Sequence, residues 1–460
     1  MSAAGTTSRQ LGDATPEDRS TRSRAWTVTG LLVVFMMINF ADKSVLGLAA
    51  DEIRADLSLS ATQFGLANSA FFLLFSVAAV VVGMYADKVR PTTVILIMAL
   101  LWSVAQVPPA VGGGLAVLIG SRIVLGAAEG PAFPVAQHAT FSWFPDHRRN
   151  LPGALVTLGI TLGVITAAPG LTWIIDHHHW RTALWVLAAV GLLWAVAWYF
   201  LGGTGTHRTA ATPTGGTATP PGGTATPPGG TATPTGGTAT PTGAPESAGK
   251  RVPYRRLFST PTWLAVTAAY FTCYWGVALM LVWLPSYLHN GLGYSSAQAG
   301  RLVVLPWVMG AVVLLTQAGV TGWLMRRGVS TRWARGGVGG AALGLGGLVC
   351  LGVPLVDGAG AKTALLAVGL GLAGSYAAVA ATTVSELAPP ARASGALGVM
   401  NAVVTTAGLA APALVGVMVD KQGTDGYQNA VVITGAMLLV GGLLSATLVD
   451  PSRDRARLGT

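Results

Sequence analysis

The chain has 460 residues and a formal net charge of +10, with 52% hydrophobic and only 10% charged residues. A soluble globular protein carries about a quarter of charged residues, so this composition excludes an ordinary soluble protein and indicates a membrane protein. The two cysteines, Cys273 and Cys350, fall in separate apolar segments and provide neither a disulfide framework nor a metal site. We therefore expect no metal ion and no cofactor.

Twelve segments of the chain are long and apolar enough to cross a bilayer, which takes roughly 20 residues of helix. The first is too long, and its downstream flank too charged, for a cleaved signal peptide. The predicted fold is all-α: twelve transmembrane helices in two six-helix halves, in a multi-pass protein of the plasma membrane (the inner membrane of a bacterial cell). The predicted spans are 26–49, 62–86, 92–111, 115–137, 151–175, 182–201, 262–288, 297–324, 336–356, 362–387, 394–419 and 428–449.

The basic residues are distributed very unevenly between the two sides of the predicted membrane. If the N-terminus is cytoplasmic, 21 of the 28 Lys and Arg residues fall on inner segments and five on outer segments. An excess of Lys and Arg in the cytoplasmic loops is typical of membrane proteins, and it places both termini in the cytoplasm. The positive charge therefore reflects topology, and we expect no nucleic-acid partner.

The first span contains the sequence NFADKSVLG, which places Asp42 and Lys43 side by side at membrane depth. A charge in the hydrocarbon costs several kcal/mol, so such residues usually face protein or water and mark a functional site. The loop after the second span reads GMYADKVRP, residues 83–91.

The fourth span holds the other two membrane charges, Arg122 and Glu129. Spans one and four run in opposite directions, and Asp42 and Arg122 each lie about seven residues, or ~10 Å, from the outer end. Glu129 is two turns further along, on nearly the same face and ~10 Å deeper. The four side chains are thus expected to form a charged column.

Two interpretations of this column remain open. It can be a buried ion-pair network that only joins two helices, although such pairs stabilise poorly because desolvation offsets the attraction. It can also bind an anion and a proton together: an anion that engages the cation frees a carboxylate to take up a proton. Intramembrane ionisable residues favour the second interpretation.

A change in composition divides the chain into two sets of six spans. Residues 202–257 contain TATPPGG, TATPPGG and TATPTGG in succession, which predicts a disordered cytoplasmic linker. The predicted organisation is a cytoplasmic tail (1–25), an N-terminal half (26–201), this linker (202–257), a C-terminal half (258–449) and a second tail (450–460).

Several stretches resemble the anion:cation symporter family of the major facilitator superfamily. RIVLGAAEGPAFPVAQHATFSWFPDHRRN is similar to the family's fourth helix and following loop, NFADKSVLGLA to its first helix and WRTALWVLAAVGLLWAVAW to its sixth. In the second half, LVWLPSYL resembles the seventh helix and APPARASGALGVMNAVVTTAGLAAPALVG the eleventh. The resemblance covers both halves and leaves out the tails and the linker.

This resemblance implies roles for individual residues. The proton-coupling acids of the family match Asp42 and Glu129, and the substrate-binding residues match Lys43, Arg122 and Asn401. Gly83, Asp87 and Lys88 match the superfamily's loop that closes the cytoplasmic side.

The chain also departs from the family pattern at several positions, beginning with Lys43, where Arg is commoner. Arg90 stands where Gly is usual in the loop, and Arg326 occupies the acidic position of the second-half counterpart. Phe40 replaces a Tyr, which favours a less hydroxylated, aromatic carboxylate over a sugar acid.

The sequence therefore predicts a transporter rather than an enzyme: a monomer that imports an organic anion, such as a sugar acid or aromatic acid, by proton-coupled symport with alternating access. The choice between a proton and a sodium ion as the coupling ion stays open. Two alternatives are a proton-coupled exporter of small molecules and a non-transporting membrane sensor, although the latter lacks a soluble signalling domain.

Overall fold

The computed structural model describes residues 16–85, 90–145, 148–205 and 253–459, and every regular element in this part of the chain is helical. Twelve of its helical segments are long and apolar enough to span a membrane, as predicted. The predicted linker falls largely on residues 206–252, and the loop residues Asp87 and Lys88 also lie outside the described residues.

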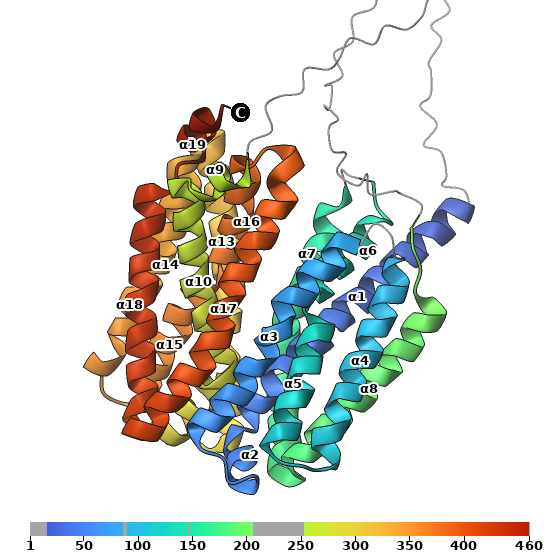
Figure 1. Ribbon diagram of the computed structural model, residues 1–460, viewed down its shortest axis with the longest axis vertical. Coiled ribbons are helices and arrows are strands. Elements are labelled where there is room, and N and C mark those ends of the chain that lie inside the picture. Colours follow the sequence, from blue (N-terminus) through green and yellow to red (C-terminus); the bar gives the residue numbers. More distant parts are fainter. Residues whose placement is uncertain (1–15, 86–89, 146–147, 206–252, 460) are drawn as a thin grey trace, which may run out of the picture.

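The N-terminal half forms one bundle in Figure 1, coloured blue to green. Its helices are α1 (Pro16–Leu48), α2 (Ala50–Asp56), α3 (Ala61–Tyr85), α4 (Pro91–Val111), α5 (Leu115–Glu129), α6 (Ala132–Phe141), α7 (Asn150–His177) and α8 (Trp180–Leu201). The helix α1 begins well before the predicted first span, so part of the predicted N-terminal tail is helical.

The C-terminal half forms a second bundle beside the first, coloured yellow-green to red (Figure 1). Its helices are α9 (Tyr254–Phe258), α10 (Pro261–Val282), α11 (Leu284–Ser286), the π-helix η2 (Tyr287–Gly291), α12 (Ser296–Leu302), α13 (Leu305–Arg326), the π-helix η3 (Arg332–Gly337), α14 (Val338–Leu351), the 3-10 helix η4 (Val353–Leu355), α15 (Ala359–Gly374), α16 (Tyr376–Leu387), α17 (Pro390–Gln422), α18 (Asp425–Leu448) and α19 (Pro451–Leu458).

Several predicted spans are interrupted where the sequence predicted continuous helices. Span four is divided into α5 and α6 directly after Glu129, because Pro131 has no backbone N–H to donate and its ring crowds the preceding turn. Span eight is divided into α12 and α13, where Pro306 follows the break, and span ten is divided at Ser375. The break in span four matters most, since it makes Glu129 the last residue of its helix.

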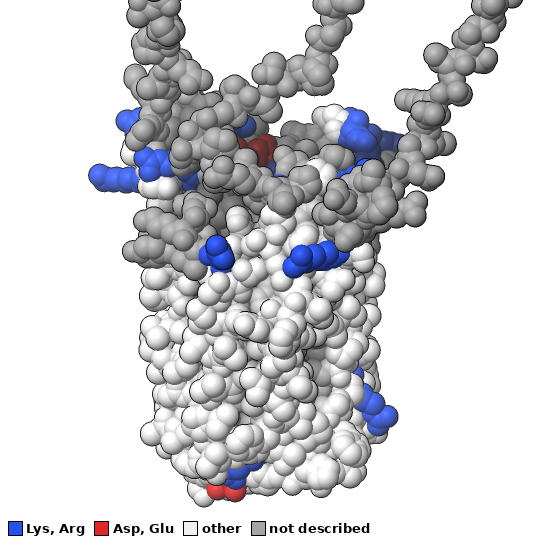
Figure 2. Space-filling model, turned by 90° about the vertical axis from the view of Figure 1, so that its right-hand side faces the viewer, with Lys and Arg blue, Asp and Glu red and all other residues white. Residues whose placement is uncertain are grey.

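The outer surface of the bundle is apolar over most of its height. Figure 2 shows a broad uncharged belt on the N-terminal half, with Lys and Arg gathered near one end. Large apolar side chains of the spans are exposed in both halves, such as Leu193 and Phe200 in the first and Leu315 in the second. Such a belt matches the hydrocarbon core of a bilayer, so the chain is a multi-pass membrane protein.

The two halves are tightly packed at the end that carries α2. A methyl group on Gly65 of α3 would lie 2.2 Å from the carbonyl oxygen of Pro412 on α17, so only glycine permits this approach. The Asp420 carboxylate, also on α17, accepts hydrogen bonds from the main-chain N–H groups of Ala61 and Thr62, both at 2.7 Å. It therefore caps the first turn of α3 from the other half of the protein.

Further contacts between the halves lie at the same end or at mid-depth. Asn290 donates to the Asp51 carboxylate at 2.9 Å, and Ser76 of α3 is hydrogen-bonded to Thr405 of α17. Figure 1 shows the ribbons of the two halves separating toward the opposite end, where α16 and α19 lie.

The C-terminal residues form an ordered helix, α19, that docks on α10. The buried Asp454 accepts a hydrogen bond from the main-chain N–H of Thr262 at 2.9 Å and from Arg453 at 2.9 Å. Burial acts to raise the pKa of Asp454, but these hydrogen bonds outweigh it and hold the pKa below its ordinary value. The predicted second tail is therefore fixed to the bundle over residues 451–458.

Candidate functional site

The four membrane charges come from α1 and α5, and three of them are almost completely buried. The exposed fractions are 1% for Asp42, 3% for Arg122 and 1% for Glu129. The helix α5 lies so close against α3 that a methyl group on Gly126 would come within 1.8 Å of the Phe71 carbonyl oxygen. Small residues at such positions allow membrane helices to pack closely.

Lys43 forms an ion pair with Glu129 within the N-terminal half. Its ammonium donates to the Glu129 carboxylate and, at 2.5 Å, to the side-chain oxygen of Asn39 one turn earlier on α1. The rings of Phe40, Phe71 and Phe75 lie 4.9 to 5.7 Å from the same nitrogen, within the range of cation–π attraction. Lys43 is therefore held by several partners at once.

Arg122, in contrast, has no carboxylate partner among the described residues. Its guanidinium donates one long hydrogen bond of 3.3 Å to the main-chain carbonyl of Asp42, and its Nη2 is buried without a partner in this part of the chain. The Asp42 carboxylate accepts from Gln106 at 3.0 Å, and its second oxygen is also without a partner. A buried guanidinium has five donors to satisfy, so this arrangement leaves capacity for an anion.

A cavity opens beside these charges at the contact between the two halves. The space between its atoms, including the part open to solvent, is about 310 Å³, and Lys43, Arg122 and Asn68 provide its polar wall. The remaining lining residues are Phe71 and Phe72 from α3 and Ala278, Leu281 and Val282 from α10. We call it the charged cavity.

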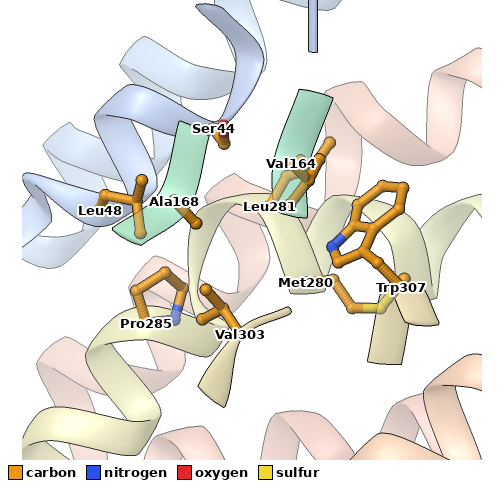
Figure 3. A pocket seen from close by; sticks show the side chains of 9 residues that line it. All are labelled: Ser44, Leu48, Val164, Ala168, Met280, Leu281, Pro285, Val303 and Trp307. Carbon is orange, nitrogen blue, oxygen red and sulfur yellow. The ribbon is translucent and has the colours of Figure 1, made fainter. Parts of the chain in front are cut away.

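A second, smaller cavity lies nearby and is almost entirely apolar (Figure 3); the space between its atoms, including the part open to solvent, is about 230 Å³. We call it the apolar cavity. Its lining residues are Ser44, Leu48, Val164, Ala168, Met280, Leu281, Pro285, Val303 and Trp307, contributed by α1 and α7 of one half and by the region from α10 to α13 of the other.

Comparison with known proteins identifies the fold and the family. The sequence profile of the Major Facilitator Superfamily matches residues 32–378. The chain belongs to the major facilitator superfamily. This major facilitator protein is therefore a membrane transporter and not an enzyme.

Its relatives confirm the resemblance to the superfamily's anion transporters. The chain is 30% identical to a probable sulfoacetate transporter, SauU, of Cupriavidus necator, over 91% of this chain and 92% of the relative. It is 26% identical to the hexuronate transporter of Bacillus subtilis, over 90% and 91% of the two chains. With the D-galactonate transporter of Escherichia coli the identity is 25%, over 95% and 97%.

Solved structures of the superfamily share the fold of this transporter. A bacterial homolog of the human lysosomal transporter Spinster, in an inward-facing and unoccupied conformation, matches with a TM-score of 0.71 and 17% identity, over 97% of this chain and 99% of the other. A D-xylose–proton symporter matches with a TM-score of 0.70 and 15% identity, over 93% and 99%.

The structure gathers most, but not all, of the residues singled out from the sequence of this major facilitator protein. Asp42, Lys43, Arg122 and Glu129 lie together. Asn401 is half-buried on α17, one turn before Thr405, and lines neither cavity. Gly83 lies in the last turn of α3, and the rest of its predicted loop site, Asp87 and Lys88, is outside the described residues.

Three further polar residues of the site were missed in the sequence. Gln106 bonds Asp42, Asn39 bonds Lys43, and Asn68 lines the charged cavity. Each is an amide residue inside an otherwise apolar span, which is itself a signal, because a polar group at membrane depth needs a partner. Asn39 also lies four residues before Lys43, the spacing that brings two side chains together on a helix.

Proposed function

We propose that this transporter imports an organic anion together with a proton by alternating access. The observation that carries the proposal is Arg122: a buried guanidinium with an unpartnered N–H group, facing a cavity that both halves line, beside two carboxylates. The relatives are named as transporters of sulfoacetate, hexuronate and D-galactonate, which supports an organic acid as the cargo.

The charges of the site explain why anion and proton would bind together. Two carboxylates and two cations give a neutral set, and an arriving monoanion would leave one negative charge in excess. An uncompensated charge is costly in a low-dielectric interior, so one proton per anionic charge restores neutrality. We assign the anion to Arg122 and Lys43 and the proton to Asp42 and Glu129.

Competition for Lys43 provides the coupling step. An anion that draws the Lys43 ammonium away from Glu129 leaves a buried carboxylate without its cation, and that carboxylate then takes up the proton. Asn401 is assigned to substrate contact in a state where α17 has moved, since it lies close to the interface but outside both cavities in this structure. Because each monomer contains the whole site, we expect the monomer to be the working unit.

Sidedness follows from the positive-inside bias. The α2 end carries few basic residues, so we assign it to the outside and both termini to the cytoplasm. The tight packing at the α2 end then corresponds to a closed outer side. Gly83, Asp87 and Lys88 are assigned to the loop that closes the inner side in the opposite state.

The test is transport by a Glu129→Gln variant in reconstituted vesicles. Uptake driven by a pH gradient should be lost, whereas exchange of internal for external substrate should continue, because exchange needs no net proton movement. Glu52→Gln is the matched control, since the Glu52 carboxylate on α2 accepts a hydrogen bond from the main-chain N–H of Trp180 and lines neither cavity. The assignment is wrong if the Glu129 variant still accumulates substrate against a gradient as the wild type does.

Two further conditions separate the alternatives. Replacing the proton gradient by a sodium gradient should not drive uptake. Comparing right-side-out and inverted vesicles distinguishes import from export, and the absence of flux for every organic acid tested would favour a sensor.

A further inference from the structure

A cluster of tryptophan and arginine side chains lies where α13 ends and η3 begins, away from both cavities. Its members, which we call the Trp–Arg cluster, are Trp323, Arg326, Arg327, Arg332 and Trp333. The helix α10 leaves the end that carries α9, and α13 returns to it, so the cluster lies at the end opposite α2 (Figure 1). A hydrogen bond of 3.0 Å from Thr321 to the Ala334 carbonyl joins the two arms of this hairpin. Two spans, Ser296–Arg326 and Arg332–Leu355, end here, which corresponds to the depth of the lipid headgroups.

The cluster lies on the outer surface of the C-terminal half, next to the apolar belt. On α13, Trp323 is 45% exposed and continues a stripe of exposed side chains that includes Val312 and Leu315, about three and two turns earlier. Trp333 is 57% exposed, and α14, which follows it, exposes Leu348 farther along. The two rings therefore lie where the headgroup of a lipid would meet its acyl chains.

The three arginines of the cluster have no carboxylate partner in the part of the chain that the structure describes. No Asp or Glu occurs between positions 301 and 356, and Glu386 is already paired with Arg335 of η3. The Nε of Arg332 is buried without a hydrogen-bond partner among the described residues. The cluster is thus a concentration of positive charge with unused N–H donors.

Two of the arginines lie over the tryptophan rings. The guanidinium carbon of Arg327 is 4.0 Å from the centre of the Trp323 ring, and that of Arg332 is 5.3 Å from the centre of the Trp333 ring. A guanidinium over a ring is attracted to the ring face, which leaves the N–H groups along its edge free. Those groups match the oxygens of a phosphate, which a guanidinium binds through two parallel hydrogen bonds.

We infer that the Trp–Arg cluster binds the phosphate of an anionic phospholipid, whose acyl chains lie along the exposed apolar side chains of α13 and α14. The positive-inside bias accounts for basic residues at this end, but it does not require them to be clustered, unpaired and placed over exposed rings. Arg326 also stands where the family pattern has an acid, and an acid there would repel a phosphate. With three cations and no acid, the cluster favours a lipid with net negative charge over a zwitterionic one. The inference does not depend on the cargo or on the coupling ion.

The experiment measures the affinity of the purified full-length transporter for its first bound lipid by native mass spectrometry. The probes are dioleoyl phosphatidylglycerol, which is anionic, and dioleoyl phosphatidylcholine, which has the same acyl chains and no net charge. We expect phosphatidylglycerol to bind more tightly. The variant Arg326→Gln/Arg327→Gln/Arg332→Gln should weaken its binding by about tenfold or more, because each arginine near an anionic lipid contributes roughly fivefold. Binding of phosphatidylcholine should hardly change.

The matched control removes the same amount of charge outside the cluster. Arg22→Gln/Arg255→Gln/Arg256→Gln replaces exposed arginines of α1 and α9 at the same end of the bundle (Figure 1), and it should leave the affinity for phosphatidylglycerol nearly unchanged. The inference is overturned if the cluster variant binds this lipid as tightly as the control variant does, or if the wild type binds both lipids equally. Displacement of phosphatidylglycerol by millimolar inorganic phosphate would also overturn it, since that outcome indicates a site for soluble phosphate. Arg327→Gln alone, with an expected loss of roughly fivefold, replaces the triple variant if the latter does not fold.

Discussion

The two halves of this transporter share a fold but differ in where they keep their charged residues. The N-terminal half buries Asp42, Lys43, Arg122 and Glu129 within its membrane spans. In the described C-terminal helices, charged residues lie near helix ends: Arg335 pairs with Glu386 at 2.5 Å near the start of α14, and Asp420 lies close to the end of α17. The C-terminal half contributes apolar walls to the cavities instead.

This difference would suit the alternating access proposed above, in which the two halves move against each other. The ion pair of Lys43 with Glu129 lies inside one half, so a rocking motion does not have to separate opposite charges in hydrocarbon. The contacts between halves are close van der Waals packing and hydrogen bonds such as those of Asp420. Such contacts break at a modest cost, and in the proposed mechanism substrate and proton binding would then shift the balance between the two states.

The largest expected effect comes from removing Arg122, which has no carboxylate partner among the described residues. Arg122→Met should lower the affinity for an organic anion by roughly a hundredfold, because truncating one partner of a buried charged contact costs about 2–5 kcal/mol. Isothermal titration or thermal stabilisation measures the loss. Arg301→Met is the control, since Arg301 is an exposed cation of the C-terminal half and its removal should change affinity by less than threefold. Equal losses in the two variants would contradict the division between the halves.

A second test asks whether the N-terminal half needs its ion pair for stability. Lys43→Gln leaves Glu129 buried without its cation and should cost about 3 kcal/mol of stability, whereas Lys43→Gln/Glu129→Gln should recover most of it. Thermal unfolding in detergent near pH 8 compares the two. A double variant no more stable than the single one would show that Lys43 acts through its aromatic neighbours rather than through Glu129.

The sequence was sufficient to predict the twelve spans and the grouping of the four charges. Apolar length determines the spans, and the high cost of charge in a membrane limits where such residues can point. Because Asp42 and Arg122 lie at similar depths on antiparallel spans, the sequence predicted that they are close together. The hydrogen bond from Arg122 to the Asp42 carbonyl confirms this prediction.

The partners within the site were beyond sequence reasoning. Nothing in the order of residues shows that Lys43, rather than Arg122, pairs with Glu129, since this depends on how α1 rotates against α5. The break after Glu129 was readable in principle from Pro131. The apolar cavity was not, because residues as far apart as Ser44, Val164 and Trp307 meet only in the folded protein.

The smallest expected effect concerns the contact by which the C-terminal half holds α3. Asp420→Asn keeps one acceptor for the N–H groups of Ala61 and Thr62 but loses the charge that favours a helix N-terminus, a change of about 1 kcal/mol. The α2 end should then open about fivefold more often.

Ser44→Cys reports this opening, because Ser44 is buried in the apolar cavity and the native Cys273 and Cys350 are buried as well. A membrane-impermeant maleimide added on the α2 side should label the introduced cysteine faster in the Asp420→Asn background, about in proportion to the fraction of open molecules. Asp425→Asn serves as the control, since Asp425 begins α18 at the same end and forms no bond to the N-terminal half among the described residues. Unchanged labelling by Asp420→Asn would mean that close packing at Gly65, and not the carboxylate, keeps the two halves together there.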